Sequence, residues 1–178
     1  MITKQIAQPK YEIKTMAKYS SDGEHRYSLS YDWSGDEPEK AIMVITNHPG
    51  KSDGVTTDLT TSLIINNVKA MNFNKVVMTN LFSKISLANE PNGVSTSSFT
   101  SSTDMITLLE AKEVETIVIA TGSFPRNNKL ACKRQQELIE QLKQAGLEDK
   151  LQVLVDGTNK PVHPLATGVR NGWSMIKF

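Results

Sequence analysis

Cysteine is nearly absent from this chain of 178 residues, and other scarcities narrow the class of protein further. The single cysteine, Cys132, excludes an internal disulfide framework, and no cysteines and histidines have zinc-site spacing. No run approaches the roughly 18 apolar residues of a membrane-spanning helix, and residues 1–14 lack the apolar centre of a signal peptide. We therefore expect a cytoplasmic protein, in a reducing compartment, that has no contact with the membrane.

Neither sign of charge is in excess, because 20 lysines and arginines face 19 aspartates and glutamates. The net charge of +1 gives no electrostatic indication of a polyanion, although a neutral protein can carry a local basic groove. Nucleic acid is thus a partner that the composition does not indicate. The length and the 38% of hydrophobic residues predict one globular domain over residues 1–178, and no feature indicates an oligomeric state.

Two glycine-rich nucleotide motifs are missing as well. No Gly-x-Gly-x-x-Gly follows an apolar run, and no loop has the glycine and lysine spacing of a Walker A motif. The sequence therefore supports neither a dinucleotide-binding domain nor a P-loop NTPase, and no cofactor is predicted.

Alternation and apolar runs predict the strands. Residues 26–33 alternate in the manner of an edge strand, after a polar extension over residues 1–24 that includes a turn signal at 20–24. Continuous apolar runs predict four strands buried on both faces, at residues 41–46, 75–82, 116–122 and 152–157. Residues 170–178 are expected either to pair as a last edge strand or to cover the end of the sheet.

Helical periodicity fills the intervals between these strands, at residues 57–71, 103–112 and 127–144. Strand and helix alternation predicts a single three-layer α/β/α domain with a mostly parallel central sheet of about four strands plus edge strands. Residues 88–102 form a long polar segment, which is either an ordinary loop or a lid over a binding site.

Polar residues gather in the segments that follow the four central strands, where ligands bind in open parallel sheets. His48 and His163 lie in these segments, and the proline after each favours an extended backbone that fixes the ring, although His-Pro also occurs in plain turns. The candidate catalytic residues are His163, Asp53 and His48. The candidate ligand-binding residues are Asn47, Pro49, Gly50, Lys51, Ser52, Asp58, Asn80, Thr121, Gly122, Ser123 and Arg170.

The segment after the first central strand, residues 47–53, has side chains suited to binding a polar ligand. Pro49 and Gly50 permit a tight turn close to a ligand, Lys51 supplies a positive charge, and Ser52 and Asp53 supply a hydroxyl and a carboxylate. The alternatives are structural, because an aspartate before a helix can cap it and a buried asparagine can fix two loops. No metal is expected, although the histidines and aspartates of these loops could form a hard-ion site.

The order of three motifs resembles the family known as domain of unknown function 1643, found in bacteria and phages. The resemblance spans residues 27–165. The first motif is residues 44–61, with their Pro, Ser-Asp and Asp-x-Thr elements, and the second is Thr79-Asn-Leu-Phe-Ser83. The third is Asp156-Gly followed by Pro161-Val-His-Pro-Leu165. The family usually has Asn-Pro-Ser in the first loop, where this chain has His48-Pro49-Gly50. The resemblance implies a fold but no established activity.

A more distant resemblance concerns uracil-DNA glycosylases, which also place an Asn/Asp-Pro element after the first core strand and a His-Pro element after the last. It implies a uracil-DNA-glycosylase-like fold, a first loop that positions water and a sugar, and a His163 that donates a hydrogen bond to the oxygen of a departing base.

Three hypotheses of function follow. The first is a site that binds or processes a nucleobase, nucleoside or nucleotide-like ligand, with N-glycosidic hydrolysis as the candidate reaction, His163 as donor or general acid and Asp53 or Asp58 orienting water. The second is a module of a phage or mobile-element system that binds such a ligand without turnover. The third is a protein-binding domain that uses Trp33, Trp173 and residues 88–102 as its surface.

Overall fold

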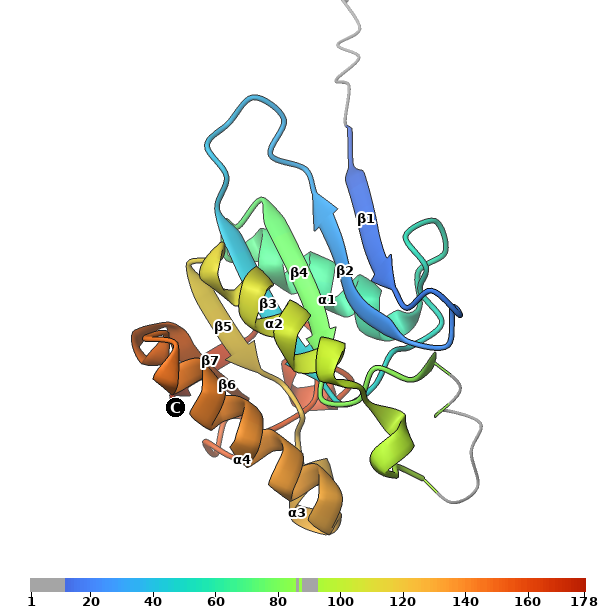
Figure 1. Ribbon diagram of the computed structural model, residues 1–178. Helices are drawn as coiled ribbons and strands as arrows, with labels where there is room; N and C mark the ends of the chain where they lie inside the picture. The colour runs from blue at the N-terminus through green and yellow to red at the C-terminus, as the bar shows by residue number, and fades with distance from the viewer. Residues whose placement is uncertain (1–11, 86, 88–92) are drawn as a thin grey trace, which may run out of the picture.

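Seven strands form one mixed sheet in the computed structural model, which describes residues 12–85, 87 and 93–178 (Figure 1). The order across the sheet is β1-β2-β4-β3-β5-β6-β7. The four central strands are parallel: β3 (Ala41–Thr46), β4 (Lys75–Asn80), β5 (Thr116–Ile119) and β6 (Leu151–Val155). The antiparallel strands lie toward the edges: β1 (Lys14–Tyr19), β2 (Arg26–Asp32) and β7 (Ser174–Lys177).

The mixed α/β class is thus confirmed, and the four apolar runs are the four parallel strands. Every residue of β3 is buried, as expected for a strand that has a neighbour on each side and a helical layer on each face. The C-terminal segment pairs with β6 as an edge strand, which was one of the two arrangements expected for it.

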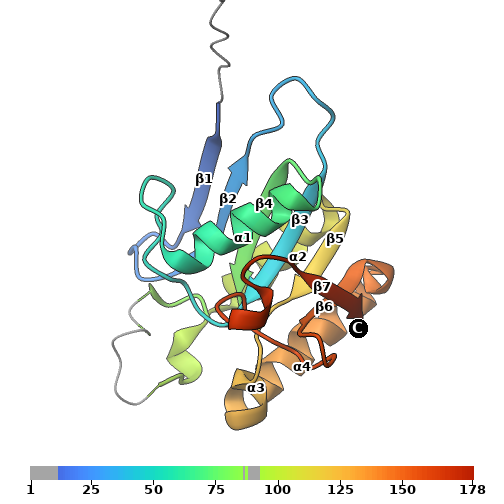
Figure 2. The ribbon, with the colours of Figure 1, turned by 180° about the vertical axis from the view of Figure 1, so that it is seen from behind.

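Helices cover both faces of the sheet (Figures 1 and 2). Helix α1 (Leu59–Ala70) buries Ile64 and Val68 against one face. Helices α2 (Ser101–Lys112) and α4 (Lys129–Gln144) bury Ala111 and Leu138 against the opposite face. The chain therefore folds into three layers, and none of the helices in the described ranges is both long and apolar enough to cross a membrane.

Short helices complete the chain between these elements. The bounds are α3 (Phe124–Asn127), η2 (Thr96–Ser98), η3 (Glu148–Lys150) and η4 (Thr167–Val169). The helix predicted over residues 127–144 begins later, because Asn128 has an extended backbone and its side chain caps α4 by accepting from the amide of Ala131.

Two expectations for irregular segments need correction. Residues 14–19 of the expected polar extension form strand β1, whose polar composition gave no signal because it lies at the exposed edge of the sheet. The expected long loop contains η2 and the first residues of α2, and its residues 88–92 lie outside the described part of the chain. Both tryptophans pack against the apolar layer beside α1.

The order of the strands creates a switch point between β3 and β5. The chain leaves β3 through α1 to reach β4 on one side, whereas β5 lies on the other side of β3 and continues into α3 and α4 on the opposite face. The chain therefore continues from β3 and from β5 to opposite faces of the sheet, the arrangement beside which ligands bind in open α/β sheets.

Candidate functional site

A cavity of about 250 Å³ lies where β3 and β4 end and α1 begins. Six of the residues predicted from sequence line it, which brings together the loops that follow β3 and β6 and the last residue of β4. The lining residues are Arg26, Thr46, Asn47, His48, Gly50, Asp58, Thr60, Thr61, Ile64, Met78, Asn80, His163 and Leu165.

His163 is held in this cavity by a close approach of two loops. A Cβ added at Gly122, where φ is +63°, would lie 2.8 Å from the backbone nitrogen of His163, so only glycine allows the two loops to touch. The Nδ1 atom of His163 accepts a hydrogen bond of 3.3 Å from the amide of Leu165. Burial, with a smaller effect of the neighbouring His48, lowers the pKa of His163 to about 4. The ring is therefore neutral at pH 7, and its proton is on Nε2.

His48 has the opposite tautomer. Its Nδ1 lies 3.3 Å from the carbonyl oxygen of Pro49, and a carbonyl can only accept, so Nδ1 carries the proton. When the ring is neutral, the Nε2 of His48 carries a lone pair, and no hydrogen bond to it is seen among the described residues. The two histidines thus offer the cavity one N–H donor and one nitrogen lone pair.

Asn47 joins the loops after β3 and β5. Its Nδ2 donates to the carbonyl oxygen of Thr121 at 3.1 Å, which fixes the orientation of the amide because that oxygen can only accept. The Oδ1 of Asn47 is buried and has no hydrogen-bond partner among the described residues. A buried amide oxygen without a donor is unfavourable, and a small movement of the first loop would be needed before a ligand could reach it. Asn80 instead donates to Oγ1 of Thr46 at 2.6 Å.

Asp58 caps α1 and closes the floor of the cavity. Its Oδ1 accepts from the amide of Thr61 at 2.8 Å and its Oδ2 from the amide of Ser52 at 3.2 Å. Burial alone would raise the pKa of Asp58, but these hydrogen bonds outweigh it and the pKa is lowered. Gly50 lines the same floor, and a Cβ there would overlap with Oδ2 of Asp58.

Arg26 is the lining residue with the full positive charge. The first residue of β2, it is only 6% exposed, and its guanidinium donates to the carbonyl oxygen of Ser52. Burial lowers the pKa of Arg26, while the neighbouring Tyr19 and Asp58 oppose that effect. An arginine remains protonated at neutral pH in spite of such a shift.

Several predicted residues support the cavity without lining it. Ser52 is buried and donates from Oγ to Thr61 at 2.7 Å, and Thr121 is buried and donates from Oγ1 to Gln135 at 2.6 Å. Pro49 is a buried residue of the loop after β3, and Gly122 allows the loop after β6 to approach the loop after β5 closely.

The remaining predicted residues lie outside the lining. The carboxylate of Asp53 is exposed and accepts from the amides of Val55 and Thr56 within its own turn, and these bonds lower its pKa. Lys51 and Ser123 are exposed, as is Arg170, which donates from Nε to the carbonyl oxygen of Leu165. The structure therefore gives these residues no contact with the cavity.

Sequence reasoning missed the lining residues that do not follow a parallel strand. The sequence analysis considered only loops after strands, whereas β2 is antiparallel to β4 and contributes its first residue to this edge of the sheet. The residues missed in this way or inside elements are Arg26, Thr46, Thr60, Thr61, Ile64, Met78 and Leu165. The available sequence signal for Arg26 was an arginine at the start of a strand that follows a turn.

No three side chains among His, Cys, Asp and Glu converge on a metal-binding point in the described part of the chain. The histidines and aspartates of the first and last loops therefore do not form a ligand set of three in this structure. The chemistry of the cavity is that of hydrogen-bond donors, acceptors and one buried cation.

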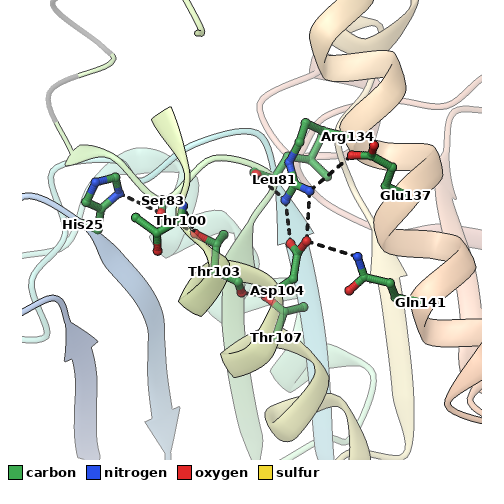
Figure 3. A network of polar contacts seen from close by, with 10 residues as sticks. All are labelled: His25, Leu81, Ser83, Thr100, Thr103, Asp104, Thr107, Arg134, Glu137 and Gln141. Atoms are coloured by element: carbon green, nitrogen blue, oxygen red, sulfur yellow. Dashed lines mark hydrogen bonds and ion pairs between the residues drawn. The ribbon is translucent and has the colours of Figure 1, made fainter. Parts of the chain in front are cut away.

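A second polar cluster lies on the other face of the sheet, beside α2 (Figure 3). His25 Nδ1 lies 2.9 Å from Oγ of Ser83, which is a distance typical of a base and a nucleophile. Ser83 is only 1% exposed, however, and its hydroxyl is also 2.7 Å from that of Thr103. A substrate cannot reach this serine, so the cluster joins β2, β4 and α2 rather than forming an active site.

Comparisons with known proteins bear on the family and not on the activity. No curated protein matches the sequence. A solved structure from a study of two esterases of the fungus Rhizomucor miehei aligns with 82% of this chain at 14% identity and a TM-score of 0.41, and this chain spans only 43% of that one. A family model described as "Protein of unknown function (DUF1643)" matches residues 26–165, which include every residue that lines the cavity. The chain therefore belongs to the DUF1643 family.

Proposed function

We propose that the cavity binds a nucleobase, nucleoside or nucleotide-like ligand and that its candidate reaction is hydrolysis of an N-glycosidic bond. The observation that carries this proposal is a neutral His163 with its proton on Nε2, in a cavity that the side-chain amide residue Asn47 also lines. The edge of a nucleobase carries both acceptors and donors, and such an edge pairs with an N–H and a carbonyl oxygen together.

The state of His163 determines the part it would play. With a pKa of about 4, only about one molecule in a thousand carries the imidazolium at pH 7, so the neutral ring acts as a hydrogen-bond donor. A donor positioned beforehand stabilises the negative charge that develops on a base oxygen as the base departs. His163 would therefore lower the barrier without transferring its proton.

The second histidine supplies the complementary step. In hydrolysis, a water oxygen forms a bond to the anomeric carbon, the bond from that carbon to the base nitrogen breaks, and its electron pair stays on the base. The water proton passes to the free Nε2 of His48, and the departing base takes up a proton from solvent. Asp58 retains a lone pair on each carboxylate oxygen and can orient the water.

The placement of the motifs also supports this proposal. Asn47-His48-Pro49 follows the first parallel strand and His163-Pro164 follows the last, an order that resembles uracil-DNA glycosylases. This resemblance concerns motif placement alone, so the geometry of the cavity carries the argument.

A non-catalytic module that binds the same ligand, as part of a phage or mobile-element system, is the second candidate. It is favoured by a specific observation: the lining of the described cavity has no serine or cysteine beside a histidine, and both oxygens of its one carboxylate already accept hydrogen bonds. Binding without turnover would use the same residues.

A thermal-shift panel tests the proposal. Bases, nucleosides, nucleotides and short single-stranded DNA are added to the wild type, to His163→Ala and to Thr167→Ala, an exposed control outside the cavity. We expect a rise in Tm with at least one compound, kept in the control and lost in His163→Ala, and chromatography of each hit then separates turnover from binding. No rise with any compound, or a rise unaffected by His163→Ala, would contradict a nucleobase site in this cavity.

A further inference from the structure

Two arginines are buried in the described part of the chain, and only one of them is paired with a carboxylate. Arg134, 2% exposed, forms a bidentate pair with Asp104 at 3.0 and 2.5 Å (Figure 3). Its guanidinium also stacks on the ring of Phe99. Its NH2 group also donates to the carbonyl oxygen of Leu81 at 3.3 Å. This is the arrangement expected for a guanidinium that has been removed from water.

Arg26 is almost as deeply buried as Arg134 but has fewer hydrogen-bond partners and no carboxylate partner among the described residues. Its guanidinium donates to the carbonyl oxygen of Ser52 and has a side-chain hydrogen bond with Tyr19, although a guanidinium has five N–H donors. Among the described residues, no carboxylate oxygen lies within ion-pair distance of Arg26. Because Arg26 lines the cavity, its remaining donors are available to whatever the cavity holds.

The other charged and titratable groups around Arg26 do not replace a partner. Asp58 interacts with it only at longer range, and its carboxylate is directed by hydrogen bonds toward Ser52 and the first turn of α1. Tyr19 contributes a side-chain hydrogen bond through a hydroxyl group and not through a carboxylate, and the other titratable groups of the cavity are its two histidines. Arg26 is therefore the cation that an anionic ligand would meet.

We propose that Arg26 binds an anionic group of the ligand, so that the cavity selects a mononucleotide over the free base or nucleoside. This inference rests on the proposed function and names the substrate class within it. Phosphate pairs well with a guanidinium because the planar fork donates two parallel hydrogen bonds. The start of α1 adds to this, since Thr60 and Thr61 of its first turn line the same cavity and a helix N-terminus favours negative charge.

The size of the cavity sets the upper limit of the ligand. At about 250 Å³ it lies below the roughly 300–1,000 Å³ of sites for drug-sized molecules. A single base with its sugar and phosphate matches this scale, and a polynucleotide would need a continuous basic groove that a net charge of +1 does not suggest.

Isothermal titration calorimetry tests the inference with four probes: each common nucleoside, its 5′-monophosphate, ribose 5-phosphate and inorganic phosphate. For the wild type we expect a monophosphate to bind at least about tenfold more tightly than its nucleoside, as a charge-assisted bidentate pair implies. Arg26→Gln should weaken monophosphate binding at least about tenfold more than nucleoside binding, whereas Arg26→Lys should retain part of the difference between the two. If Arg26→Gln does not fold, competition by inorganic phosphate against the monophosphate on the wild type gives the same information.

The outcomes separate this inference from the proposed function. Equal affinity for nucleoside and monophosphate in the wild type overturns the anionic anchor and leaves nucleobase binding intact. Binding of ribose 5-phosphate as tight as that of nucleotides, with no binding of nucleosides, supports the anchor and overturns the nucleobase proposal. Loss of nucleoside and monophosphate affinity to the same extent in a folded Arg26→Gln variant also overturns the anchor.

Discussion

The titration of His163 gives the sharpest test of the cavity, because it requires no ligand. In the unfolded chain this histidine binds a proton near its ordinary pKa of 6.5, whereas in the folded protein it does so only near pH 4. Between these values the unfolded state binds more protons, so the free energy of unfolding falls as the pH falls through this window. Above about pH 6.5 the ring is neutral in both states and contributes no pH dependence.

The magnitude follows from the gap between the two pKa values. A difference of about 2.5 corresponds to roughly 3 kcal/mol, at about 1.4 kcal/mol per pKa unit. The ring retains some contact with solvent, so we expect about 2 kcal/mol of this loss between about pH 7 and pH 4. Replacement by glutamine removes the titrating group and should remove this part of the pH dependence.

Urea unfolding of the wild type and of His163→Gln at about pH 7 and pH 4 measures the effect as a double difference. Other groups that titrate in the same range, such as Asp58 with its lowered pKa, contribute equally to both proteins and cancel. NMR provides a direct check, because the ring resonance that is absent from the variant should titrate with a midpoint near pH 4. A midpoint near 6.5, or parallel stability profiles of the two proteins, would refute a His163 that is held neutral by its partly buried position.

Three further predictions concern the supports of the site, all measured by urea unfolding. Gly122→Ala should lower the free energy of unfolding by at least about 2 kcal/mol, because φ is +63° and the new Cβ would lie 2.8 Å from a backbone nitrogen. The control Gly157→Ala has open space around the new Cβ and should change the free energy of unfolding by less than about 0.5 kcal/mol. Asp58→Ala removes a helix cap and should cost about 1 kcal/mol, and an unchanged midpoint would show that α1 does not need it. Arg134→Met leaves Asp104 partly buried without its cation and should cost about 3 kcal/mol, so a neutral result would contradict the buried ion pair.

The central sheet could be predicted from the sequence because its strands have a distinctive composition. A run such as Ala41 to Thr46 is apolar at successive positions, and only a strand covered on both faces explains that pattern in so short a segment. Strand β1 could not be recognised in the same way. Its exposed edge position allows polar and charged side chains, so its sequence resembles that of a connecting segment.

The candidate site was predictable where it depends on parallel strands. Asn47, His48 and His163 follow such strands, and the rule that ligands bind at their carboxyl ends placed them together. The rule did not find Arg26, because β2 runs antiparallel to the central strands and its first residue lies at this edge. The rule wrongly selected Asp53, because its carboxylate accepts hydrogen bonds only from amides of its own turn. The direction in which β2 runs and the direction in which the Asp53 side chain points are both properties of the folded chain, and the order of residues specifies neither.

The bond from Asn47 to Thr121 connects the cavity with a part of the molecule that a ligand never touches. The hydroxyl of Thr121 continues the connection to Gln135 in α4, on the opposite side of the sheet. The single cysteine, Cys132, lies three residues before Gln135 on that helix and therefore on the same side of it. A fluorescent label on this thiol would be a built-in sensor of occupancy, attached at a unique position and remote from the bound molecule.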